Sequence, residues 1–295
     1  MPSLKEVKNR ITSVVSTQQI TKAMKMVAAA KLRKSQERIQ QMRPFARKLN
    51  ALLQNLSAAQ VDSDGDNWYS EVREEKKILI IAISSDRGLC GSFNSNVFKG
   101  VNKLIEEKYA TPFAKGHVTV LTIGKKSSDY FSKRKCSVHG DFTLLFSSLS
   151  FENVSRAAEF VIEAYRHGKY DKVELVYNEF KNVATQILRV EQYLPIVQAQ
   201  SANVKPPSID YIYQPDQEEI ITSLIPQSLK VQLYKAVLDS NAAENGARMT
   251  AMDKATENAG ELLKQLRLTY NRTRQAAITK EILEIVGGAE ALKSS

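Results

Sequence analysis

The residues best suited to chemistry lie in one glycine- and serine-rich stretch, Ser84–Asn96, which reads SSDRGLCGSFNSN. It follows an apolar run and precedes a helical pattern, and glycines at such a junction can cradle a phosphate group. Gly88 and Gly91 nevertheless fit neither GxxxxGK[ST] nor GxGxxG, and no lysine follows the second glycine. We therefore predict that both glycines are structural residues of a tight, closely packed turn. Nucleotide binding by this loop remains as an alternative.

The same stretch holds the hydroxyls and the carboxylate of a conceivable hydrolase triad. Ser84, Ser85 or Ser92 would act with Asp86 and a distant histidine. The sequence contains no G-x-S-x-G elbow to present such a nucleophile. We therefore predict that the chain has no catalytic residues.

Metal and redox chemistry have little support in the composition. The three histidines, His117, His139 and His167, are not spaced with a cysteine or with one another, so no structural zinc site is expected. Cys90 and Cys136 lie far apart, and we expect two free thiols. No metal and no cofactor are predicted.

The elements around the loop read as a small α/β domain. The run 77–83 is continuously apolar, which is typical of a strand buried on both faces of a parallel sheet. Strands and helices then alternate, which predicts a mostly parallel sheet. The expected strands are 77–83, 118–123, 138–142, 172–177 and 184–194, the last as an edge, and the expected helices are 97–109, 125–135 and 152–167.

Both ends of the chain carry a narrow apolar seam with alternating steps of three and four residues. One seam runs from Leu4 to Leu56 and the other from Leu238 to Ala277, after which it shifts by one and continues from Ile278 to Leu292. Such seams are typical of supercoiled helices that cannot bury their apolar stripe alone. The predicted fold class is therefore α/β plus coiled coil: a long antiparallel coiled coil of the N- and C-terminal helices with an inserted small α/β domain.

Particular residues modify this coil. Gln18, Thr21 and Lys25 place three polar side chains in the first seam, either to set its register or because this part is buried in something larger. Pro44 predicts a bend, and Gly287–Gly288 predict where the second helix frays or stops.

Charge is concentrated on the first helix. The net charge is +10, and residues 1–57 contain many lysines and arginines but only two glutamates. This charge is compatible with nucleic acid, a membrane face or an acidic protein. Phe45 is the single aromatic residue of that helix, which argues against nucleic acid. No apolar run is long enough to span a membrane.

Four long stretches, in this order, resemble the gamma subunits of F-type ATP synthases, and the likeness extends over essentially the whole chain. They are QQITKAMKMVAAAKLRKSQ (18–36), SSDRGLCGSFNSNV (84–97), NAAENGARMTAMDKATENA (241–259) and YNRTRQAAITKEILEIVGGAEAL (270–292). The resemblance implies a non-catalytic rotor shaft whose coiled coil turns inside a hetero-hexameric ring of alpha and beta subunits. It implies further contacts with the epsilon subunit and the membrane c-subunit ring, and so a peripheral protein at the cytoplasmic face of a bacterial cell membrane.

The resemblance also assigns residues. It implies that Met24 and Lys25 face an acidic loop of beta. Residues of the second helix would meet the first helix and beta: Arg248, Arg274, Gln275, Thr279 and Glu281. The foot on the c ring would include Asp210, Tyr211, Tyr213 and Pro215.

The expected organisation has four parts. They are an N-terminal coiled-coil helix (1–58), a linker (59–75), the inserted α/β domain (76–205), and a foot segment with the C-terminal coiled-coil helix (206–292). Two other functions compete with a rotor shaft. One is a nucleotide-binding enzyme that uses the 84–96 loop, and the other is a basic coiled-coil adaptor for nucleic acid or membrane.

Overall fold

The computed structural model describes residues 3–59, 68–69, 71, 73–134, 136–196 and 217–293. The chain forms two compact units. One consists of residues 1–28 and 249–295, and the other of residues 29–248. The predicted foot residues Asp210, Tyr211, Tyr213 and Pro215 lie outside the described residues.

Two long helices carry the ends of the chain. Helix α1 spans Leu4–Ala59 and continues through Pro44, and helix α6 spans Gln217–Lys293. Of the two outcomes predicted at Gly287–Gly288, fraying or a stop, the stop is wrong, because α6 continues through both glycines to Lys293. A glycine inside a helix costs only about 1 kcal/mol relative to alanine, and no proline follows to break the backbone hydrogen bonds.

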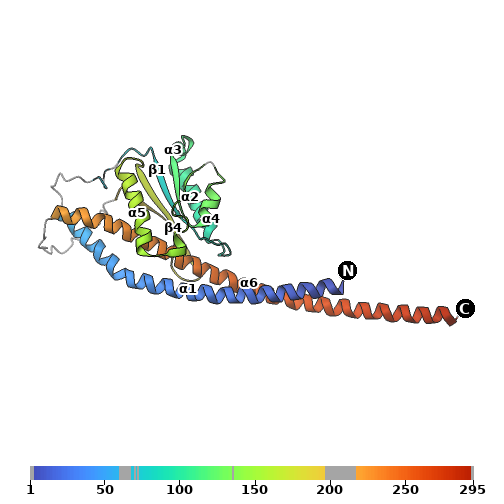
Figure 1. The fold of residues 1–295 in the computed structure, drawn as a ribbon. Coiled ribbons are helices and arrows are strands. Elements are labelled where there is room, and N and C mark those ends of the chain that lie inside the picture. The colour runs from blue at the N-terminus through green and yellow to red at the C-terminus, as the bar shows by residue number, and fades with distance from the viewer. Residues whose placement is uncertain are drawn as a thin grey trace. The chain divides into compact units, whose positions relative to one another are not determined.

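In the first unit, the start of α1 and the end of α6 pair antiparallel (Figure 1). Lys25 meets Asp253, Thr21 meets Thr256, and Gln18 lies against Gly260, so ascending positions on one helix face descending positions on the other. A Cβ at Gly260 would lie 3.1 Å from Gln18 Nε2, so the missing side chain permits this close approach.

In the second unit, the remaining halves of α1 and α6 also pack together. Leu32 and Ile39 of α1 form a buried cluster with Leu238 and Ala242 of α6. Every described position of the predicted first seam from Leu4 to Leu49 is buried or half-buried. The predicted pairing of the terminal helices is confirmed.

The second unit also contains a five-stranded sheet with the strand order β3-β2-β1-β4-β5. The first four strands in this order are parallel, and β5 is an antiparallel edge strand. The strands are β1 (Ile78–Ile83), β2 (Val118–Ile123), β3 (Ser137–His139), β4 (Lys172–Phe180) and β5 (Gln186–Leu194). The predicted α/β fold with a mostly parallel sheet is therefore confirmed.

Helices cover both faces of this sheet (Figure 1). Leu79 and Ile81 of β1 pack toward α5 and the first turns of α6, whereas Ile78 and Ile80 pack toward α2 and α4. Strand β1 is thus buried on both faces, as its continuous apolar run predicts. The helices of this unit are α2 (Phe93–Lys108), α3 (Ala110–Ala114), α4 (Lys125–Phe131) and α5 (Phe151–Arg166), with a 3-10 turn, η1, at Leu145–Ser148.

Helix α2 begins four residues before the predicted start at Val97. Phe93 is fully buried against Ala243 and Ala247 of α6, and it anchors the first turn. The loop between β1 and α2 therefore spans residues 84–92, which we call the glycine loop.

Candidate functional site

The polar seam residues of α1 bond to α6. Thr21 Oγ1 and Thr256 Oγ1 are 2.8 Å apart, and Gln18 Nε2 donates to the Thr256 carbonyl oxygen at 3.4 Å. Lys25 Nζ forms an ion pair with Asp253. These specific contacts favour the register interpretation, because a slip of the helices would break all of them.

Met24 lies half-buried beside this seam, and an apolar strip lies outside it. Ile20 and Val27 are one heptad apart on α1, and both are exposed, as is Met26. In the ion pair beside this strip, the Asp253 side chain is 61% exposed and the Lys25 side chain is 39% exposed. An exposed pair contributes only about 0–1 kcal/mol, so Lys25 can exchange Asp253 for another carboxylate at little cost.

The end of α6 presents the other predicted contact residues to solvent. Arg274, Gln275, Thr279 and Glu281 are all exposed. So are the large apolar residues that continue the shifted stripe, with Ile285 reaching 72% exposure. This end of α6 runs on beyond the N-terminus of α1 (Figure 1), so α1 does not cover it. An apolar face is therefore left without a partner in the described part of the chain, formed by Ile278, Ile282, Leu283, Ile285 and Val286.

Arg248 has a role that the sequence reasoning missed. Its guanidinium pairs with Glu244 at 2.6 Å and donates to the carbonyl oxygens of Arg87 and Gly88 at 3.0 and 3.3 Å. The Arg248 side chain is only 14% exposed. Burial raises the pKa of the Glu244 carboxyl, and the adjacent guanidinium of Arg248 opposes that shift. Arg248 therefore ties the glycine loop to α6.

The polar groups of the glycine loop are used within the loop and its neighbours. Ser84 Oγ accepts a hydrogen bond from the Ser127 backbone N–H at 2.8 Å, and Ser85 Oγ donates to the Arg87 carbonyl oxygen at 2.7 Å. Asp86 Oδ1 accepts from the Lys125 backbone N–H at 3.1 Å. Among the described residues, neither Ser84 nor Ser85, two of the hydroxyls considered for a hydrolase triad, is paired with a histidine.

The two glycines of the loop differ. Gly91 has φ +59°, in the left-handed region where glycine is favoured. Gly88 does not share that conformation, and a Cβ there would meet nothing within 4 Å. A Cβ at Gly91 would also meet nothing within 4 Å, so the prediction that close packing requires glycine is wrong at both positions, and only the φ of Gly91 favours glycine. Leu89, between them, adopts φ +62° and is exposed.

Helix α6 fills the crevice where this kind of sheet usually binds ligands. In open α/β sheets, ligands bind outside the carboxyl ends of the strands, where the strand order reverses. Here that point lies between β1 and β4. Ala243 and Ala247 of α6 pack there against Cys90, Phe93 and Phe180. Burial also raises the pKa of the Cys90 thiol, so it is an unreactive packing residue.

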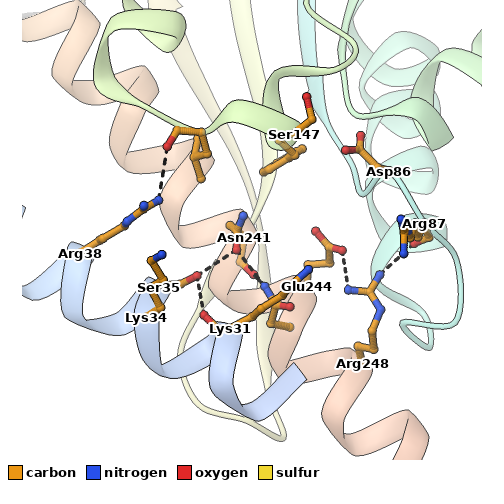
Figure 2. A pocket seen from close by; sticks show the side chains of 13 residues that line it. Lys31, Lys34, Ser35, Arg38, Asp86, Arg87, Ser147, Asn241, Glu244 and Arg248 are labelled. Atoms are coloured by element: carbon orange, nitrogen blue, oxygen red, sulfur yellow. Dashed lines mark hydrogen bonds and ion pairs between the residues drawn. The ribbon is translucent and has the colours of Figure 1, made fainter. Parts of the chain in front are cut away.

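One cavity remains beside this filled crevice, with a volume of about 530 Å³ (Figure 2). It lies among α1, the glycine loop, η1 and α6. We call it the basic pocket, because five cationic side chains line it: Lys31, Lys34, Arg38, Arg87 and Arg248. Lys31, Lys34 and Arg38 share one face of α1 at helical spacing, which the sequence could have indicated. The arginines come from distant parts of the chain, so only the fold brings them together.

Metal and membrane features are not found among the described residues. No group of three or more histidine, cysteine, aspartate or glutamate side chains there could hold a metal ion. Within the same residues, no helix is both long and apolar enough to cross a bilayer.

Known proteins similar to this chain agree with the resemblance. A family model described as ATP synthase matches residues 3–292. The ATP synthase gamma chain of Cytophaga hutchinsonii is 59% identical, with 100% of both chains covered. That of Flavobacterium johnsoniae is 56% identical, with 99% of both chains covered.

Solved structures share the fold. A chain of the Euglena gracilis mitochondrial ATP synthase, in a structure of OSCP, F1 and c-ring, matches with a TM-score of 0.64 at 20% identity, covering 98% of this chain and 94% of that chain. A chain of the Tetrahymena thermophila mitochondrial ATP synthase central stalk and c-ring matches with a TM-score of 0.57 at 24% identity, covering 80% and 99% respectively.

Proposed function

The chain belongs to the family of ATP synthase gamma chains, and from this premise we propose that it is the non-catalytic rotor shaft of that enzyme. In this role, its terminal helices turn inside the ring of alpha and beta subunits. Its foot follows the membrane c ring, and its α/β domain lies outside the catalytic ring beside the epsilon subunit.

The observation that carries the proposal is the exposed apolar end of α6. Apolar side chains from Ile278 to Val286 are exposed and have no partner among the residues that the structure describes, although they continue a regular helical stripe. Burying such a stripe stabilises an assembly by about 25 cal/mol per Å² of apolar surface. A surrounding ring of subunits would cover it from several sides, which one partner helix cannot do.

The polar seam suits the transmission of torque. Gln18 and Thr21 hold the register through their hydrogen bonds to Thr256. A shaft whose helices slid past each other would lose rotation between its two ends. Rotation would change the conformation of the beta subunits, because each orientation of an asymmetric shaft favours a different state of each beta subunit.

The predicted contacts fit this arrangement. Met24 and the exchangeable Lys25 would face an acidic loop of beta, and the exposed residues Arg274, Gln275, Thr279 and Glu281 would meet the ring at the end of α6. Asp210, Tyr211, Tyr213 and Pro215 would form the foot on the c ring. The protein would then be peripheral, at the cytoplasmic face of the bacterial cell membrane.

A non-catalytic role is supported by the filled crevice. Helix α6 takes the place of a ligand at the carboxyl edge of the sheet, and the hydroxyls of Ser84 and Ser85 are bonded within the chain. The chemistry of ATP would then belong to the partner subunits.

Purification of the complex that contains this chain, from its native cells, tests the proposal. We expect alpha and beta subunits to co-purify in an active ATPase, whose hydrolysis is coupled to rotation of the chain. Isolation of the chain without them, or with ATP hydrolysis by the chain alone, would contradict a non-catalytic shaft.

A further inference from the structure

The basic pocket has the dimensions of a small-molecule site. Its volume of about 530 Å³ falls within the roughly 300–1,000 Å³ of ligand pockets. Four separate parts of the chain enclose it, all within the second unit: α1, the glycine loop, η1 and α6. Figure 2 shows basic side chains from α1, the glycine loop and α6 around this hollow.

The side chains that line the pocket carry more positive than negative charge. Asp86 and Glu244 are the two carboxylates against the five cations. Asp86 already accepts a backbone hydrogen bond from Lys125, and Glu244 is paired with Arg248. Both carboxylates are therefore engaged, and the remaining cations repel one another across the hollow.

The cations that remain available come mainly from α1. Lys31 and Lys34 form no ion pair with any residue that the structure describes, and the Arg38 guanidinium donates to the Leu149 carbonyl oxygen at 3.3 Å. The uncharged groups are bonded internally, since Ser35 Oγ donates to the Lys31 carbonyl oxygen and lies 2.9 Å from Asn241 Oδ1. The pocket thus offers charged donors and few free acceptors.

The pocket also lies where α/β sheets commonly bind ligands. Asp86 and Arg87 follow the carboxyl end of β1, next to the point where the strand order reverses. This edge of an α/β sheet is where ligands usually bind. Helix α6 occupies the usual ligand-binding crevice, and the basic pocket lies beside it at the same edge of the sheet.

We propose that the basic pocket binds a small phosphate-bearing anion, held by Lys31, Lys34 and Arg38 on one side and by Arg87 on the other. Charge-assisted hydrogen bonds to phosphate are about twice as strong as neutral ones, and arginine forks match phosphate oxygens. The anion bridges α1 to the glycine loop and so tightens the packing of the sheet on the helices. The site lies within the second unit, and Ser35 and Asn245 of the two apolar seams are among the residues that line it.

Calorimetric titration of the full chain with sodium pyrophosphate, in magnesium-free buffer of moderate salt, tests this assignment. We expect one bound pyrophosphate per chain and a higher unfolding temperature in its presence. Lys31→Gln and Arg38→Gln should each weaken binding about tenfold, whereas Lys31→Arg should retain it. Parallel titrations with inorganic phosphate and with ADP distinguish a free phosphate from a nucleotide as the source of the group.

Lys48→Gln is the matched control, because Lys48 lies on the same helix in the same unit, is exposed, and does not line the pocket. It should bind pyrophosphate as the unchanged chain does. Equal weakening by Lys48→Gln would reveal non-specific attraction to a basic surface and overturn the proposal. Absence of heat with all three phosphate probes would also overturn it, as expected if the pocket accepts only an acidic segment of a partner subunit.

Discussion

At the scale of single residues, buried polar groups where α6 meets the sheet respond to pH. Asp239 of α6 is 5% exposed, and burial raises the pKa of its carboxyl from 3.8 to about 6. Lys235 and Arg43 oppose the shift, whereas Glu179 and Glu191 of the adjacent strands add to it. Between about pH 4 and pH 6, the Asp239 carboxyl is therefore protonated in the folded protein but ionised in the unfolded chain.

Asp239→Asn should remove this pH dependence. Between about pH 4 and pH 6 the folded state binds more protons, so stability from this group is complete below the unfolded pKa and is lost as pH rises through 6. At about pH 7.5 the variant should exceed the unchanged chain by roughly 1–3 kcal/mol in free energy of unfolding. Urea denaturation at both ends of the range checks this. A gain that persists undiminished at pH 4 would show that the carboxyl charge is not the cause.

The glycine loop provides a matched pair of substitutions. Gly91→Ala places a side chain at φ +59° and should destabilise the chain by roughly 1–2 kcal/mol. Gly88→Ala meets no neighbouring atom and should change stability by less than about 0.5 kcal/mol. Thermal unfolding of both variants decides the matter, and a larger loss at Gly88 would contradict the assigned loop geometry.

At the scale of elements, the seam between α1 and α6 distinguishes adjacent residues. Leu263 is 7% exposed in the seam, whereas its neighbour Leu262 is 37% exposed. Leu263→Asp should cost several kcal/mol, because it removes apolar packing and buries a charge. Leu262→Asp should cost less than about 1 kcal/mol. Urea denaturation of the two variants provides the comparison, and equal losses would mean that the seam does not hold the helices together.

Most elements could be predicted from local pattern. The apolar run 77–83 was sufficient because its strand is buried on both faces, and the seam of α1 was sufficient because burial there repeats with the period of a helix. The alternative that Gly287–Gly288 stop α6 was wrong, because two glycines only weaken a helix that has no other stop signal. The bond from Arg248 to the glycine loop and the basic pocket were not predicted, because the residues that form them are far apart in sequence and meet only in the fold.

At the scale of the whole molecule, we propose that rotation of this chain couples the c ring to the ring of alpha and beta subunits. The family membership is established by relatives that match the entire chain, whereas rotation and the c-ring foot are our proposals. The proposed division into an N-terminal helix (1–58), a linker (59–75), an α/β domain (76–205) and a foot with the C-terminal helix (206–292) places the moving contacts at both ends of the shaft.

Met24→Lys tests the coupling at the catalytic ring. A lysine there would add a cation opposite the acidic beta loop, and a pair sheltered from water would contribute roughly 1–3 kcal/mol in one orientation only. That extra binding stabilises one rotational state and so raises the barrier to the next. ATP turnover should therefore fall roughly tenfold, and proton pumping should fall further than ATP hydrolysis. The measurement is the ratio of pumping to ATP hydrolysis in inverted vesicles. An unchanged ratio would place Met24 away from the ring.

A single-molecule measurement would show whether this chain rotates within the alpha and beta ring during ATP hydrolysis. The alpha and beta ring is fixed to a surface, and a bead is attached to a Lys133→Cys variant that also carries Cys136→Ser. Lys133 is exposed in the described structure, and Cys90 is buried and should not be labelled. On addition of ATP we predict rotation of the bead in one direction, with one dwell for each beta subunit in every turn. A complex that hydrolyses ATP at its full rate while the bead stays still would contradict the account.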